Sequence, residues 1–351
     1  IKLHVEIKMC FMKHTRFTIV IIVFLISHTF SQASQEFKTG LADSLQKIRR
    51  DRTGISQVEF SDYVFLDAAR DEAESFQLVV IPEKDAVENL SITIDSPEKD
   101  GSKLTIAWHR VGYVRTGNPS YAVEYVGWWP DPLMPARSFD VAKDEIQPLW
   151  FTVSVPENAE PGAYRGEIRI SNSTCKRKIN LQVQVRNFRI PRPGTLATPF
   201  GIYMKYIAQW YYGKNSELKP EQYAKWCYFL AKYRISSKNI GWTYIEREYE
   251  TTNGQRYISE VDISQFADTI KDLMDNYYAP YAIGITRLPG INTLRAGLDN
   301  NKTWCTPEII TKNVIPYVNE WKRQGLSRNA YIYGVDEVSG QDLVELSADI
   351  Y

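Results

Sequence analysis

The chain has 351 residues, of which 44% are hydrophobic and 24% charged, and its basic and acidic residues balance to a net charge of zero. This composition is typical of a globular protein with room for about two domains. The sequence has no basic run of the kind that follows phosphates and no GxGxxG or GxxxxGK pattern. We therefore expect no nucleic acid, dinucleotide or P-loop nucleotide as a ligand.

The N-terminal residues have the pattern of a secretory signal peptide. Nine apolar residues, TIVIIVFLI, span 18–26; they follow Lys13 and Arg16 and precede the small residues Ser31 and Ala33. This run is too short to span a membrane, which takes about 20 apolar residues. We predict that residues 1–33 are upstream residues and a cleavable signal peptide, and that the protein is secreted or periplasmic without a membrane span.

Residues 34–190 are predicted to form an antiparallel β-sandwich. Short β-branched runs with alternating polarity are separated by turn residues, which is typical of this fold. The predicted strands cover 76–81, 90–95, 104–108, 149–155, 164–170 and 179–185. The segment RIPRPGTLATP then brings three prolines and a glycine, so we assign residues 191–198 to a linker.

Beyond the linker, predicted strands alternate with predicted helices. The strands cover 199–203, 237–244, 281–286 and 331–335, and the helices cover 219–233, 262–278 and 306–325. Successive β-α units indicate parallel strands with crossover helices. We interpret 199–351 as the first four β-α units of a (β/α)8 barrel, and since such a barrel has eight, we expect the chain to be part of a longer protein.

Histidine and cysteine usage excludes several kinds of active site. Beyond the signal peptide the only histidine is His109, which lies in a predicted strand and is interpreted as a half-buried strand residue. A single strand histidine of this kind cannot build a Ser-His-Asp triad, a Cys-His dyad or a multi-histidine metal site. Cys175, Cys227 and Cys305 allow at most one disulfide. We expect no metal or organic cofactor, which leaves carboxylates as the catalytic groups.

An Asp-Glu pair occurs three times in the chain. The pairs at 71–72 and 144–145 lie in polar stretches and are interpreted as solvated turn charges. Asp336 and Glu337 follow the predicted strand YIYGV, at the strand end where barrel enzymes assemble their sites. The alternative for this third pair is a helix-capping acid beside a surface glutamate.

If Asp336 and Glu337 form an active site, their adjacent positions in the sequence restrict the reactions that the site can catalyse. Sequence neighbours cannot lie on opposite sides of a sugar as general acid and nucleophile. They can serve a 2-acetamido sugar, whose own carbonyl oxygen attacks the anomeric carbon while one acid protonates the leaving oxygen and its neighbour orients the amide.

Four segments in chain order resemble glycoside hydrolase family 123: ESFQLVV at 74–80, WWPDPLMP at 128–135, WFTVSVPENAEPGAYRGEIRI at 150–170 and YIYGVDEV at 331–338. The resemblance implies an N-terminal β-sandwich, a (β/α)8 barrel and hydrolysis of terminal β-linked N-acetylgalactosamine. It also implies that Glu337 is the general acid/base and that Asp336 stabilises the acetamido group. We interpret WWPDPL as a rigid turn packed between the two domains.

Residues at the ends of the predicted barrel strands are candidates for sugar binding. Tyr203 with Lys205, Trp242 with Tyr244, and Arg287 follow the first, second and third strands. Aromatic rings suit the apolar face of a sugar, and long donors suit its hydroxyls. The alternative for each is a structural position in the core or rim.

The sequence therefore predicts a secreted, retaining, exo-acting β-N-acetylgalactosaminidase-like hydrolase that uses substrate-assisted catalysis. Its expected partner is a glycan with a terminal N-acetylhexosamine, and residues 1–351 alone are expected to be inactive. Two alternatives remain open: a non-catalytic carbohydrate-binding protein with a degenerate barrel, and a glycosidase of other specificity that takes its nucleophile from the remainder of the barrel.

Overall fold

The computed structural model of the chain describes residues 35–192, 196, 198, 200–237, 246–277, 283–285, 307–327 and 330–332. The predicted signal peptide and the residues Trp242, Arg287, Asp336 and Glu337 lie outside this part. The chain divides into two compact units between Ile190 and Pro191. No helix in the described part combines the length and apolarity needed to cross a membrane.

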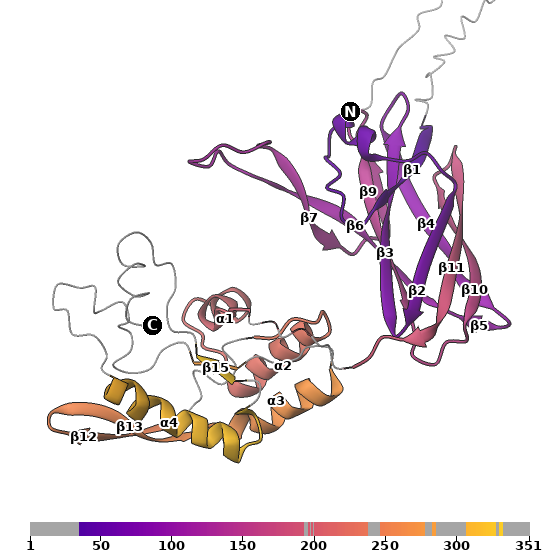
Figure 1. Cartoon of the computed structure of the whole chain (residues 1–351). Helices are drawn as coiled ribbons and strands as arrows, with labels where there is room; N and C mark the ends of the chain where they lie inside the picture. Colours follow the sequence, from indigo (N-terminus) through magenta and orange to yellow (C-terminus); the bar gives the residue numbers. More distant parts are fainter. Residues whose placement is uncertain are drawn as a thin grey trace, which may run out of the picture. The chain divides into compact units, whose positions relative to one another are not determined.

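The first unit is a sandwich of two β-sheets (Figure 1). One sheet has the order β1-β3-β9-β6-β7 and the other β2-β11-β10-β4-β5, with β8 paired to β4. A 3-10 turn, Arg52–Gln57, follows β1. The strands are β1 (Phe37–Asp43), β2 (Tyr63–Arg70), β3 (Glu72–Pro82), β4 (Val87–Lys99), β5 (Ser102–Lys103), β6 (Thr105–Arg115), β7 (Trp128–Met134), β8 (Ser138–Val141), β9 (Gln147–Val155), β10 (Gly162–Ser171) and β11 (Lys176–Arg189).

The sandwich core is built from alternating positions of both sheets. In β9, Leu149, Phe151 and Val153 are fully buried, while the residues between them point to the other face. Ile168 in β10 and Val183 in β11 are also fully buried and belong to the same apolar cluster. A strand places alternate side chains on opposite faces, so this pattern buries one face of each sheet. All six predicted sandwich strands are confirmed.

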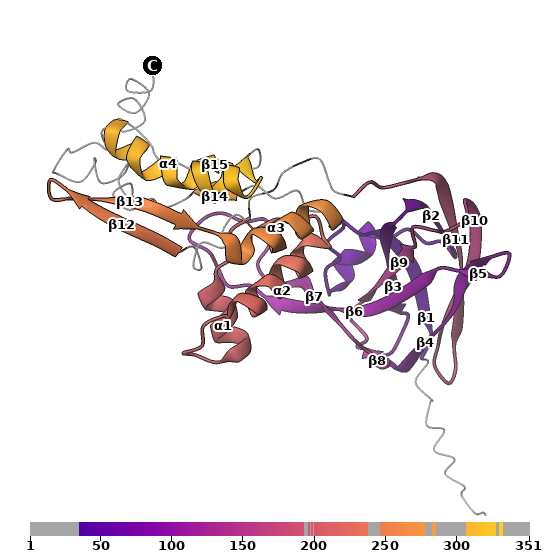
Figure 2. The same ribbon diagram turned by 90° about the horizontal axis from the view of Figure 1, so that it is seen from below.

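Two features of the sandwich differ from the prediction. Strand β2 pairs with β11 in parallel, so the sandwich is not wholly antiparallel. The WWPDPL segment is not a turn but most of β7, which pairs with β6 at the edge of its sheet. An edge strand tolerates Pro130 and Pro132 because its outer side requires no backbone N–H donor. Figure 2 shows β6 and β7 as neighbouring strands of one ribbon.

The first two Asp-Glu pairs have structural partners, which corrects their interpretation as purely solvated charges. The carboxylate of Glu72 accepts a hydrogen bond from the backbone amide of Ala69 at 2.6 Å, across the tight β2–β3 turn. Glu145 forms an ion pair with Arg50 at 2.7 Å. His109 is half-buried in β6, as predicted. Cys175 is half-buried and Cys227 is fully buried.

The second unit contains helices and short strands. Its elements are α1 (Met204–Tyr212), α2 (Pro220–Ala231), β12 (Glu246–Thr252), β13 (Gln255–Asp262), α3 (Ser264–Asn276), β14 (Ile283–Ile285), α4 (Pro307–Arg323) and β15 (Ala330–Ile332). Helices α2, α3 and α4 confirm the three predicted helices. Figure 2 shows α2 beside α3, and the hydroxyl of Tyr228 in α2 donates to Asp272 in α3 at 2.6 Å.

Parallel strand pairing is present at two places in this unit. Strands β14 and β15 pair in parallel, with α4 between them in the chain. Phe200 forms a single parallel bridge with Ser237. Strands β14 and β15 correspond to the predicted third and fourth strands. Phe200 and Ser237 lie in the predicted first and second strands. The described residues therefore contain β-α-β connections, but they do not extend to a closed barrel.

The antiparallel hairpin β12–β13 was not predicted. Its turn residues Asn253 and Gly254 both have positive φ, 53° and 78°. Asn-Gly is the residue pair favoured in two-residue hairpin turns, because both central positions need this backbone conformation. The Asn-Gly pair between two runs of strand-forming residues was the signal that could have revealed it. Helix α4 lies along this hairpin in both views (Figures 1 and 2).

Glu320 joins α4 to the start of α3. The side chain is 4% exposed, and its carboxylate accepts hydrogen bonds from the backbone amide of Ile263 at 3.2 Å, from Arg323 at 2.5 and 2.9 Å, and from Gln324 at 3.1 Å. Burial raises the pKa of Glu320, but the hydrogen bonds from Arg323, Gln324 and Ile263 outweigh it, so the pKa lies below its ordinary value. The ionised carboxylate therefore stabilises the folded unit.

We expect Glu320→Gln to destabilise the second unit at neutral pH by about 1–3 kcal/mol, because it removes the charge that these donors stabilise. A carboxylate with a lowered folded-state pKa contributes stability above its unfolded pKa, and this contribution is lost as the pH falls through the folded value. The difference from the unsubstituted protein should therefore shrink below pH 4.5, the ordinary value for glutamate. Urea unfolding at neutral pH and near pH 3.5 measures it.

Glu250→Gln is the matched control, because Glu250 is exposed in β12. We expect it to change the free energy of unfolding by less than about 0.5 kcal/mol at either pH. A Glu320→Gln penalty of the same size at both pH values would contradict the role assigned to the charge.

Candidate substrate-binding surface of the second unit

The segment that follows the first parallel bridge is the part of the described second unit best placed for ligand binding. Phe200 bridges Ser237 in parallel, and α1 and the turn after it come next, before α2 begins at Pro220. In α/β sheets and barrels, the loops that leave the carboxyl ends of parallel strands carry the binding residues. Helix α1 is an extra helix within such a loop.

Helix α1 exposes an unusual number of aromatic rings. Ala208 is fully buried, and Met204 and Ile207 pack partly against the apolar core. The other side carries exposed rings, which we call the aromatic face: Tyr203 (71% exposed), Tyr206 (67%) and Trp210 (84%). The rings of Tyr203 and Tyr206 lie 5.9 Å apart. Large exposed apolar surfaces commonly mark a binding site.

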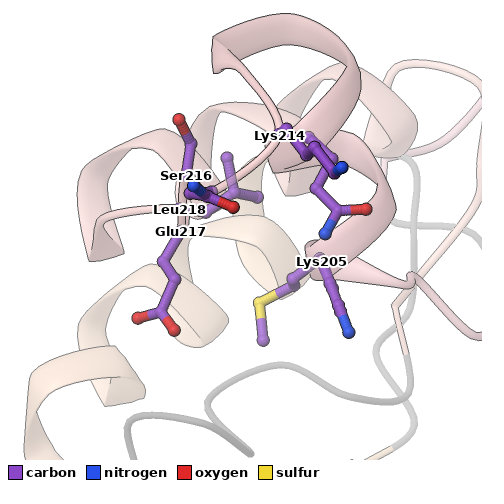
Figure 3. Close-up of a pocket in the computed structure, with 8 residues that line it drawn as sticks. Lys205, Lys214, Ser216, Glu217 and Leu218 are labelled. Atoms are coloured by element: carbon purple, nitrogen blue, oxygen red, sulfur yellow. The ribbon is translucent and has the colours of Figure 1, made fainter.

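A hollow of about 610 Å³ lies between α1 and the turn that leads to α2 (Figure 3). Met204, Lys205 and Gln209 of α1 line it, together with the segment 214–218. Figure 3 shows Lys205 and Lys214 on one side of the hollow and Glu217 on the opposite side. Apart from Met204 and Leu218, every lining residue has a polar or charged side chain.

The turn that shapes the hollow is held by local hydrogen bonds. Gly213 ends α1 with φ of +108°, a left-handed conformation that glycine adopts readily. The Ser216 amide donates to the Gly213 carbonyl at 2.9 Å, and the Ser216 hydroxyl donates to the Tyr212 carbonyl at 2.6 Å. Leu218 is buried in the apolar core. The turn is thus anchored at both ends.

Of the sequence-predicted site residues, the structure describes two, Tyr203 and Lys205. Tyr203 lies directly before α1 and belongs to the aromatic face. Lys205, a further strand-end candidate, lines the hollow. Trp242, Arg287, Asp336 and Glu337 lie outside the described residues, so their candidate roles stay predictions.

Three residues of this surface were missed by the sequence analysis: Tyr206, Trp210 and Lys214. The segment YMKYIAQWYY at 203–212 could have indicated Tyr206 and Trp210, because rings at positions i, i+3 and i+7 share one side of a helix. In the part of the chain that the structure describes, no group of three or more His, Cys, Asp or Glu side chains could hold a metal ion.

Comparison with known proteins shows what the first unit is similar to. Residues 55–172 match the family model described as the glycoside hydrolase 123 N-terminal domain. The resemblance to family 123 that the sequence predicted is thereby confirmed. No curated protein matches the chain.

Among solved structures, the chain resembles a family 123 glycoside hydrolase from Clostridium perfringens, which is described in connection with glycolipid glycan hydrolysis. The TM-score is 0.60 at 16% sequence identity, and the match covers 89% of this chain and 60% of that one. The chain thus spans 60% of the length of its family 123 counterpart. Because the match covers 89% of this chain, it extends beyond the first unit into the second.

Other solved structures share only a small part of the architecture. An endo-fucoidan hydrolase of glycoside hydrolase family 107 matches with a TM-score of 0.20 and 14% identity, over 36% of this chain and 13% of that one. A PapD-like domain of human CEP192 matches with a TM-score of 0.22 and 8% identity, over 54% of this chain and 99% of that one. Scores this low carry no argument about this chain.

Proposed function

We propose that the full-length protein is a secreted glycoside hydrolase that removes terminal β-linked N-acetylgalactosamine with retention of configuration. In this proposal residues 34–190 form the sandwich domain, 191–198 the linker and 199–351 the first half of a (β/α)8 catalytic barrel. The family 123 domain supports the hydrolase class. The glycan hydrolysis described for the Clostridium perfringens relative supports a glycolipid or glycoconjugate as substrate.

The observation that carries the proposal is the parallel β14-α4-β15 unit in a chain with a family 123 domain. Strand β15 ends at Ile332, and only three residues separate it from Asp336. Four residues reach at most about 14 Å, which supports the proposal that the acidic pair lies near the carboxyl end of this parallel strand. Catalytic groups of barrels come from the loops at these strand ends.

In the proposed mechanism, the two acids and the acetamido group of the substrate have separate roles. The 2-acetamido carbonyl oxygen attacks the anomeric carbon as Glu337 donates its proton to the leaving glycosidic oxygen. Asp336 accepts a hydrogen bond from the acetamido N–H and stabilises the positive charge that develops on this group. Glu337 then removes a proton from water, which opens the cyclic intermediate and restores the sugar with its configuration retained.

The direct test is release of the chromophore from an aryl N-acetyl-β-galactosaminide by the full-length protein. We expect turnover of this substrate and little turnover of the matching galactoside without the 2-acetamido group, because the attacking oxygen is then missing. Equal cleavage of both would overturn the neighbouring-group mechanism. Sugar binding without any turnover would instead identify a carbohydrate-binding protein with a degenerate barrel.

The aromatic face is expected to contribute to binding of the sugar rings. Trp210→Ala should raise KM about 3- to 10-fold, since an aromatic contact contributes about 0.5–1.5 kcal/mol beyond area burial. The melting temperature should change little, because Trp210 is 84% exposed. The control Phe188→Ala removes a 58% exposed ring from the sandwich and should leave KM unchanged. An unchanged KM for Trp210→Ala would exclude the aromatic face from substrate binding.

A further inference from the structure

The hollow beside α1 has an imbalance of charge. Lys205 and Lys214 both line it, and the segment 201–216 that contains them has no acidic residue. Within the part of the chain that the structure describes, neither ammonium group forms an ion pair. Two cations on the same side of one hollow, without a paired acid, favour an anionic ligand there.

The remaining polar groups of the hollow complete a donor-rich wall. Gln209 and Asn215 carry amide donors that add to the two ammonium groups. Glu217 lies on the opposite side in Figure 3. A carboxylate there accepts hydrogen bonds from hydroxyls and repels a second anion. The hollow therefore suits a ligand with one anionic group on the lysine side and hydroxyls on the other.

The lysines are carried by ordered backbone. Lys205 lies in the first turn of α1, and Lys214 follows Gly213 in the turn that the two Ser216 hydrogen bonds hold. Because these backbone positions are set, the approach of an anion requires ordering of the side chains only. Tyr203 and Tyr206, on the aromatic face, belong to the same segment as Lys205.

We propose that this hollow binds the carboxylate or sulfate of an acidic glycan and so selects substrates that carry an anionic sugar next to the terminal N-acetylgalactosamine. This inference rests on the proposed function and names its substrate class. The shared chemistry is a single anionic group on a hydroxyl-rich ring. A carboxylated sugar and a sulfated sugar are the two sources that the experiment distinguishes.

The experiment compares three oligosaccharides with the same terminal sugar: a neutral one, one with a carboxylated neighbouring sugar and one with a sulfated neighbouring sugar. With the full-length protein, we expect kcat/KM for at least one acidic substrate to exceed that for the neutral one. This preference should decline when the ionic strength is raised from about 0.05 M to about 0.5 M, since salt screens the attraction.

The double substitution Lys205→Met with Lys214→Met should lower kcat/KM for the preferred acidic substrate about tenfold or more, as expected for loss of two charge-assisted contacts. The neutral substrate should lose less than about threefold, so the preference disappears. The conservative pair Lys205→Arg with Lys214→Arg should retain it. Lys225→Met is the matched control, because Lys225 is exposed on α2 and does not line the hollow; the preference should persist.

Calorimetric titration of the same oligosaccharides separates failure of this inference from failure of the proposed function. Tighter binding of the acidic oligosaccharide that the double variant loses, without hydrolysis of any substrate, supports the hollow and overturns the hydrolase proposal. Hydrolysis with no acidic preference, or an equal loss for acidic and neutral substrates in the double variant, overturns the inference and leaves the hydrolase proposal intact.

Discussion

Glu337→Gln is expected to lower kcat of the full-length protein by about 10²- to 10⁴-fold on substrates with a poor leaving group, which is the usual contribution of a positioned general acid. The loss should be much smaller for an activated aryl leaving group, because such a group departs without full protonation. Initial rates on a natural-type disaccharide and on an aryl glycoside measure the two cases. General acid catalysis by Glu337 predicts a larger loss of kcat on the disaccharide than on the aryl glycoside.

Asp336→Asn should behave differently from Glu337→Gln. It removes the charge that stabilises the acetamido group as positive charge develops, so kcat should fall for both kinds of leaving group. KM should change little, because the amide side chain still offers a hydrogen-bond acceptor. An unchanged kcat in both variants would contradict the catalytic roles. It would support the alternative that Asp336 caps a helix and Glu337 is a surface residue.

A control for these variants comes from another Asp-Glu pair. Asp144→Asn changes an exposed aspartate between β8 and β9 of the sandwich. It should leave kcat and KM unaltered, since the pair at 144–145 contributes an ion pair from Glu145 to Arg50 and no catalytic group. A loss of activity equal to that of Asp336→Asn would indicate a general effect of surface charge.

Phe151→Ala is expected to destabilise the sandwich by about 3–5 kcal/mol, which is typical of a buried aromatic replaced by alanine. Phe151 is fully buried in β9, and its ring stacks on Phe76 with centroids 5.3 Å apart and an interplanar angle of 12°. The substitution removes apolar contacts from the core cluster of the sandwich and leaves a cavity that the rigid strands fill only in part. Chemical unfolding followed by the fluorescence of the protein measures the loss.

Phe65→Ala is the matched control in the same sandwich. Phe65 lies in β2 and is 51% exposed, so its replacement should cost less than about 1 kcal/mol. Similar losses for the two variants would mean that the stacked pair is not part of the cooperative core. A loss confined to Phe151→Ala would support the assignment of that core.

The sandwich was the most predictable part of the fold, because its strands can be recognised from the pattern of neighbouring residues. Leu149, Phe151 and Val153 alternate with polar or half-buried residues, and this period of two is visible without any knowledge of the neighbouring strand. Strand β7 was not predicted, because Pro130 and Pro132 argue against a strand. Only its place at the edge of the sheet, where no further strand requires its N–H groups, makes it possible.

The candidate binding surface was predictable only in part. Tyr203 and Lys205 were selected because they follow a predicted strand, a rule that needs no side-chain information. Tyr206, Trp210 and Lys214 were missed, because an aromatic residue on a helix is usually part of a core. Whether a ring is buried depends on which side of the helix meets the rest of the unit, and this is a property of packing.

The sequence alone determined the strands of the sandwich and the three longer helices of the second unit, because hydrophobic period, caps and turn residues act over a few neighbouring positions. The family resemblance came from four short segments of the sequence. The tertiary structure decided three other matters: the parallel pairing of β2 with β11, the exposure of the α1 rings, and the hollow that brings Lys205 and Lys214 together. These features depend on contacts between residues far apart in the chain, or on which side of a helix packs against the core. The local periodicity of the sequence predicts neither kind of contact.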